Sequence, residues 1–219
     1  MILILRYKDF LSGELCLTVI KVTISTKNFR FLYSIDEVLS KIKEIKTNHI
    51  LPKELVTNNN DVIITTETEK VLIQSNKIFI PKAFNHYYLF SNIFLIANNR
   101  KKFEEIVIGI DPGKTIGFAV IAEGKKILGT SEFFIAVDAV KEAISIFFNV
   151  ETDKFRINIG KGGGKIKEEI AMRLKSIFHD KVPINHVNEN FSSQSKNHLT
   201  QTKQSKNINA ALNIACRDT

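Results

Sequence analysis

Three closely spaced apolar segments between residues 106 and 134 constrain the fold most strongly. "IVIGID" (106–111) is followed by "IGFAVIA" (116–122), and "KKILGTSEFF" (125–134) comes directly after the turn "AEGK". Neighbouring parallel strands need a crossover of a dozen or more residues, so these segments are predicted to form an antiparallel meander. The first strand ends on a single acid, Asp111, and a Pro-Gly turn follows it.

The rest of the chain alternates helical and strand patterns, which predicts an α/β fold. Apolar residues recur at helical spacing in three later segments, and two short segments rich in branched residues lie between them. The predicted helices are 137–150, 165–178 and 205–217, and the predicted strands are 155–160 and 182–187. We therefore expect a mixed sheet of three antiparallel strands followed by two parallel strands, flanked by helices.

The first hundred residues predict a smaller α/β domain. Strands are expected at 14–24, 62–66 and 77–81, and helices at 34–46 and 84–99, the first of them beginning at Ser34. The charged segment 100–105 is taken as a junction. The predicted domains are 1–104, of unknown role, and 105–219.

The charge of the chain favours an anionic partner. Its 219 residues carry a formal net charge of +8. From Lys154 to the end, 12 Lys and Arg stand against 5 Asp and Glu, a net of +7. Nucleic acid is the expected partner, although a solvated basic surface is the alternative. Two distant cysteines, no signal-like segment and no apolar run of membrane length predict a cytoplasmic protein without a membrane partner.

Four motifs carry a resemblance to a known superfamily. "GIDPGKTIGFAVI" looks like the first-strand motif of the RuvC and YqgF branch of the RNase H-like superfamily. "RINIGKGGGKIKEEIAMRLKSIF", "HVNENFSSQSK" and "KNINAALNIACR" resemble, in that order, motifs of uncharacterised archaeal proteins that are candidate nucleases of RNase H fold. The resemblance covers about residues 105–219 and implies an RNase H-like domain there.

The resemblance also implies a metal-dependent site. The first strand, 106–111, should end beside the fourth predicted strand, 155–160, and open α/β sheets bind ligands at such a place. Asp111, Glu189 and Asn207 are the implied catalytic residues, with Asp111 and Glu189 as Mg²⁺ ligands and Asn209 as an alternative to Asn207. Two metal ions at such a site stabilise the attacking and leaving oxygens of a phosphodiester. The competing interpretation is that Asp111 only caps a turn.

The sequence departs from the family pattern at the other acids. Strand four ends with Asn158 and Gly160, and amides stand at Asn188 and Asn207 where acids are expected. An amide lacks the charge that Mg²⁺ prefers in its ligands. We therefore expect an incomplete acidic site, with Mg²⁺ bound weakly or not at all.

A glycine-rich loop, "GKGGGK", lies between a predicted strand and a predicted helix. Backbone amides in such a loop, with a helix N-terminus behind them, can bind an anion. The predicted phosphate-binding residues are Lys114, Thr115, Gly160, Lys161, Gly162, Gly163, Gly164 and Lys165. The alternative is a flexible connection. The polar run 188–206 either contacts a nucleic-acid backbone or is a disordered loop, and His179, His186 and His198 are taken as structural or surface residues.

Three functions remain open on the sequence. The first is a Mg²⁺-dependent nuclease or Holliday-junction-resolvase-like enzyme acting on DNA or RNA. The second is a catalytically inactive nucleic-acid-binding protein on the same fold. The third is an actin-like or sugar-kinase-like nucleotide site, to which "DPGKT" fits locally, but no second "D-x-G" strand is found in the first hundred residues. A second copy of the chain is an additional partner to consider.

Overall fold

The structure is a computed structural model that describes residues 19–53, 62–188 and 205–217. The chain divides into two compact units, Met1–His86 and Tyr87–Thr219, and each is described by itself. Helix α2 (His86–Ala97) belongs almost entirely to the second unit. The domain boundary that the sequence predicts between residues 104 and 105 stays a prediction.

The first unit is built on a parallel sheet with the order β2-β1-β3-β4. Its central strands bury branched residues on both faces, which is typical of parallel sheets. Ile63 and Ile64 are adjacent on β3, so their side chains point to opposite faces, and both are at most 1% exposed. The elements of this unit are β1 (Ile20–Ser25), α1 (Phe29–Leu39), β2 (Ile45–Ile50), β3 (Val62–Ile64), the 3₁₀ helix η1 (Lys70–Leu72) and β4 (Ile78–Phe79).

The predicted helix 34–46 is wrong at both ends. Helix α1 begins after Asn28, whose side chain accepts a hydrogen bond from the Phe31 amide at 3.1 Å. Ser34 lies inside the helix and donates to the Arg30 carbonyl at 3.0 Å. The helix ends at Leu39, and Ile45 begins an edge strand that pairs with β1. The apolar spacing continued past the true end because Ile42 and Ile45 are buried outside the helix.

The second unit contains the predicted five-stranded mixed sheet, in the order β7-β6-β5-β8-β9. The β5–β6 and β6–β7 pairs are antiparallel, and the β5–β8 and β8–β9 pairs are parallel. The fold-class prediction is therefore confirmed, and the arrangement is compatible with an RNase H-like fold. The strands are β5 (Phe103–Pro112), β6 (Ile116–Ala122), β7 (Lys126–Phe133), β8 (Thr152–Gly160) and β9 (Ile184–Val187).

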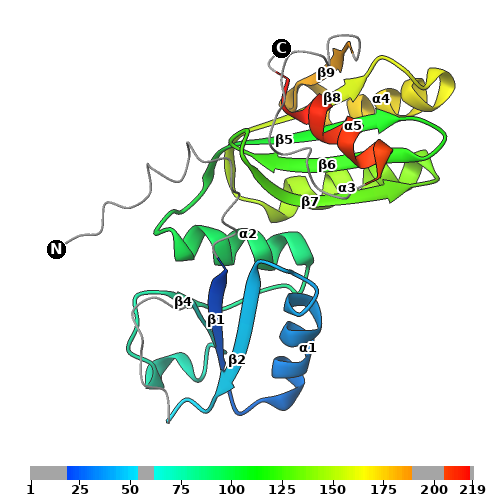
Figure 1. Ribbon diagram of the computed structural model, residues 1–219. Coiled ribbons are helices and arrows are strands. Elements are labelled where there is room, and N and C mark those ends of the chain that lie inside the picture. Colours follow the sequence, from blue (N-terminus) through cyan, green and yellow to red (C-terminus); the bar gives the residue numbers. More distant parts are fainter. Residues whose placement is uncertain (1–18, 54–61, 189–204, 218–219) are drawn as a thin grey trace, which may run out of the picture. The chain divides into compact units, whose positions relative to one another are not determined.

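Helices cover both faces of this sheet (Figure 1). Helix α5 (Lys206–Ala215) lies across one face, where Ala211 and Leu212 pack on Val107 and Ala119. Helices α3 and α4 cover the other face. They are α3 (Ala136–Asn149) and α4 (Gly164–Phe178), and the 3₁₀ helix η2 (His179–Lys181) follows α4. Among the helices that the structure describes, none has the length and apolar character needed to cross a membrane.

Two glycines let α5 lie very close to the sheet. A Cβ atom at Gly109 would stand 2.6 Å from the Ala215 nitrogen and 2.7 Å from its Cβ. A Cβ atom at Gly117 would stand 2.5 Å from the Asn207 carbonyl carbon. Side chains at these two positions would therefore push the helix away. The close approach fixes the N-terminus of α5 over the start of β6.

Candidate functional site

The candidate site lies at one end of the strands of the five-stranded sheet, where β5, β7, β8 and β9 end and β6 begins. We call this end of the sheet the Asp111 edge. Asp111 is paired with Gly117, and Gly117 is paired with Glu132 on β7. Directly opposed residues in antiparallel strands point to the same face. Asp111 and Glu132 therefore flank Gly117 on the face that α5 covers.

Asn207 lies at this edge, as its predicted role requires. Its backbone packs on Gly117, and its Nδ2 donates to Glu132 Oε1 at 2.8 Å. Ser205, the N-cap of α5, donates to the same oxygen at 2.6 Å and accepts from the Ile208 amide at 3.2 Å. Glu132 thus anchors the first turn of α5 to β7, and a carboxylate at a helix N-terminus is favourable.

Glu132 is a site residue that the sequence pattern did not reveal. Hydrogen bonds from Ser205 and Asn207 hold its pKa below the ordinary value of 4.5. Its carboxylate is therefore charged at neutral pH and faces the amide of Asn207. The first turn of α5 contains no acidic residue of its own, so Glu132 supplies the negative charge beside this helix N-terminus. By contrast, the side-chain oxygen of Asn209 is buried, so Asn209 is the poorer candidate for a ligand at the edge.

The glycine loop lies against the turn that follows Asp111. Gly163 precedes α4 with φ of +82°, and a Cβ atom there would stand 2.7 Å from the Pro112 carbonyl carbon and 2.9 Å from its Cβ. Gly164 has φ of +50°, but a Cβ atom there would meet open space. The Lys161 amide donates to the Val187 carbonyl at 3.0 Å. The loop is therefore fixed between the ends of β5 and β9.

The predicted phosphate-binding residues lie at this same edge. Gly160 ends β8, and Lys161 and Lys165 are exposed beside Gly163. Lys114 is exposed and Thr115 is half-buried in the turn between β5 and β6. Among the residues that the structure describes, these three lysines form no ion pair. The edge therefore presents three lysines outside the described ion pairs, beside the carboxylates of Asp111 and Glu132.

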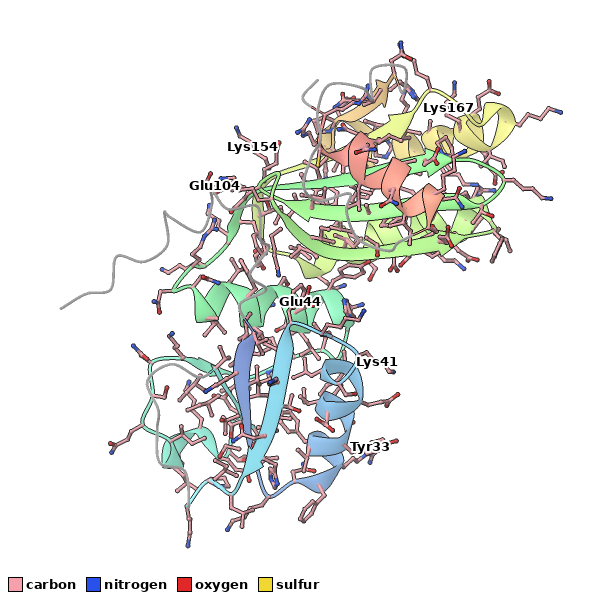
Figure 2. All side chains as sticks on the ribbon, viewed as in Figure 1. Tyr33, Lys41, Glu44, Glu104, Lys154 and Lys167 are labelled. Carbon is pink, nitrogen blue, oxygen red and sulfur yellow. The ribbon has the colours of Figure 1, made fainter. Side chains whose placement is uncertain are left out.

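The opposite end of the sheet has the opposite character. Glu104, Glu105, Glu123 and Asp153 gather there, and Figure 2 shows Glu104 at the far end of the sheet from Lys167. Most of this charge is compensated, because Arg100 pairs with Glu123, Lys102 pairs with Asp153, and Arg156 lies 3.0 Å from Glu105. Of the two ends of the sheet, the one that holds Asp111 is the better place for an anionic ligand, because acids predominate at the other end.

Asn158 has a structural role and not a place in the site. It is fully buried and faces Gly109, two residues before the end of β8. Its Nδ2 donates to the carbonyls of Ile214 and Arg217, each at 3.1 Å, and its Oδ1 accepts from Asn185 at 3.3 Å. Asn158 thus satisfies the carbonyls at the end of α5, as buried polar groups require.

The acids expected to bind metal are only partly described. Glu189 lies outside the described residues, as does most of the polar run 188–206. Within the described ranges no group of three or more His, Cys, Asp and Glu could hold a metal ion. Asp111 and Glu132 are separated by Gly117, over which the backbone of Asn207 is packed. These residues alone fit a two-metal site poorly.

Comparisons with known proteins leave the family open. No protein-family model matches the chain, and no curated protein matches it. A search of solved structures finds the Argonaute of Marinitoga piezophila, in complex with a 5′-OH guide RNA and target DNA. The match has 15% identity and a TM-score of 0.30, and covers 78% of this chain and 39% of the Argonaute chain. A likeness at this level does not establish a family.

Proposed function

We propose that the second unit is an RNase H-fold nucleic-acid-processing domain that binds the phosphate backbone at the edge holding Asp111. The packing of Gly163 on Pro112 carries this proposal, because it fixes the glycine loop and the Asp111 turn as one surface. Lys161, Lys165 and Lys114 surround that surface without ion-pair partners among the described residues. Phosphate contacts from lysine release counterions, so binding should be strong at low salt.

Binding without efficient cleavage is favoured over a complete nuclease. If the chain cuts, Asp111 with Glu189 would hold Mg²⁺, and the ion would stabilise charge that develops on the phosphate. At this edge the structure describes the carboxylates of Asp111 and Glu132, and that of Glu132 already accepts two hydrogen bonds. The alternative, a Mg²⁺-dependent or resolvase-like nuclease, needs further ligands from residues such as Glu189.

A titration with matched charge variants tests the proposal. Affinity of the full chain for fluorescent single- and double-stranded oligonucleotides is measured by anisotropy at rising salt. Lys161→Ala with Lys165→Ala should weaken binding and lower the salt slope by roughly 0.7 to 0.9 for each phosphate that is no longer neutralised. Lys101→Ala with Lys154→Ala removes the same charge from exposed positions away from this edge and should leave the slope unchanged. Equal effects of the two pairs would contradict the proposal.

Cleavage is measured in the same samples with Mg²⁺ or Mn²⁺. Weak or absent cleavage by the wild type is expected from the incomplete acidic set. Robust metal-dependent cleavage that Asp111→Asn abolishes would show that the acidic site is complete. That result would favour the nuclease over the binding protein.

A further inference from the structure

A second positive cluster adjoins the glycine loop on the outer strand β9. His186 is exposed on this strand and is paired with Ile159 of β8. Two lysines of α4 and one of the glycine loop lie close enough to act on the charge of its ring. We call this cluster the β9 basic surface; it comprises Lys161, Lys167, Lys175 and His186.

Backbone contacts fix this surface next to the candidate site. The Lys161 amide bonds to the carbonyl of Val187, the residue after His186. The ammonium group of Lys167 lies 3.5 Å from the Lys161 carbonyl, so its side chain folds back over the loop. Lys175 is two turns further along α4. The β9 basic surface is therefore continuous with the glycine loop.

The charges on this surface are uncompensated. Although the His186 side chain is exposed, its ring loses part of its hydration, which lowers its pKa, and the positive charges of Lys167, Lys175 and Lys161 lower the pKa further. In the described part of the chain none of these lysines has an ion-pair partner, whereas Arg173 of the same helix pairs with Glu169. Asp180 shares a depression with Lys175 but is not among the groups that act on His186. The β9 basic surface thus brings three lysines together near the His186 imidazole, which is neutral at neutral pH.

We infer that the β9 basic surface extends the phosphate-binding edge, and that a nucleic-acid backbone bound there brings a proton onto His186. The inference rests on the proposed function, because it extends the same surface. A phosphodiester backbone is the occupant whose repeated negative charge matches a row of lysines that continues from the glycine loop. An isolated small anion would need only one of these groups.

The direction of the proton linkage follows from the charges. Bound phosphates screen the lysines and supply negative charge beside the imidazole, so the pKa of His186 is higher in the complex than in the free protein. The gain in affinity is then fully present below the pKa of the free protein and is lost as pH rises through the pKa of the complex. Each unit of difference changes the affinity by about tenfold.

The test is the pH dependence of oligonucleotide affinity at constant ionic strength. The full chain is titrated with a fluorescent single-stranded oligonucleotide between pH 5.5 and 8. The wild type should bind more tightly as the pH falls, and His186→Gln should bind with a flatter profile. His49→Gln is the control, since it removes an imidazole from the first unit and keeps a donor for the Thr26 carbonyl. Lys167→Ala with Lys175→Ala should weaken binding several-fold at every pH.

The outcomes separate the inference from the proposed function. If the wild type binds but His186→Gln keeps the full pH dependence, the inference is wrong and the proposed function stands. If the oligonucleotide does not bind at low salt, the proposed function fails, and the inference fails with it. If polyglutamate binds with the same proton uptake and the oligonucleotide does not, the partner is an acidic protein. A rise in the pKa of His186 on oligonucleotide binding, seen by NMR, would support the inference directly.

Discussion

Replacing Gly163 with alanine should damage both stability and nucleic-acid binding, whereas the same change at Gly164 should damage neither as much. Both glycines have positive φ, which costs an alanine about 1–2 kcal/mol. At Gly163 the new Cβ atom would also stand 2.7 and 2.9 Å from atoms of Pro112. Accommodating this extra atom should lower the free energy of unfolding by about 1–3 kcal/mol more. Either the loop or the Asp111 turn must move to make room. The expected difference between the two variants is therefore about 1–3 kcal/mol.

Urea unfolding of the full chain, followed by circular dichroism, measures this difference. Two compact units allow two transitions, and only that of the second unit should shift. Oligonucleotide affinity is measured on the folded variants, because a displaced loop should carry Lys161 and Lys165 away from Asp111. Equal stability losses for the two alanine variants, or unchanged affinity in Gly163→Ala, would refute the packing on which the site depends.

Two further predictions concern the first turn of α5. Asn207→Asp places a second carboxylate where the amide now donates to Glu132 at 2.8 Å. Because the two carboxylates repel each other, the melting temperature without metal should fall, and Mn²⁺ should restore it. If Mn²⁺ does not change the melting temperature of the variant, Asn207 does not belong to a metal site. Glu132→Gln should destabilise the second unit at pH 7, and its difference from the wild type should be smaller at pH 3. The reason is that a lowered pKa gives stability that is present above the ordinary value of 4.5 and lost as pH falls through the folded value. Urea midpoints at the two pH values measure this, and an equal difference at both would contradict it.

The sheet order was predictable because chain connectivity dictates it. Segments 106–111, 116–122 and 125–134 are too close together for parallel crossovers, so they had to pair as a meander. The longer helical connections that follow then allowed the parallel strands β8 and β9. The position of Asp111 at a strand end also followed from the end of the apolar run. Local pattern and connectivity were sufficient for these features.

Glu132 was not predictable because a β-bulge changes the register. Lys126 pairs with Ala122 near the turn, but a shift between Val120 and Ile121 displaces the later pairs by one residue. Counting from the turn would pair Gly117 with Ser131 and turn Glu132 to the opposite face. A one-residue shift reverses every side chain beyond it. The sequence does not mark this bulge.

The prediction for Asn158 was wrong because of tertiary structure, and that for the start of the first helix because of a local choice between two caps. Asn158 reads as a missing acid near a strand end, but its partners are carbonyls more than fifty residues away at the end of α5. The start of helix α1 was predicted too late in the chain. Asn28 and Ser34 are both good N-caps by residue type, but only Asn28 makes the capping bond. The contacts of Asn158 lie beyond the local pattern, whereas the cap of α1 is a local bond that residue type alone did not single out.

Backbone amide NMR of the full chain during titration with an oligonucleotide tests the central claim most directly, because it locates the bound nucleic acid. The account predicts that the largest shifts fall on Lys114 and Thr115, on residues 160–165 and on Ser205 to Asn207. The compensated acidic end, marked by Glu104 and Asp153, should remain unchanged. Shifts confined to that end, or to the first unit, would contradict a phosphate-binding edge at Asp111.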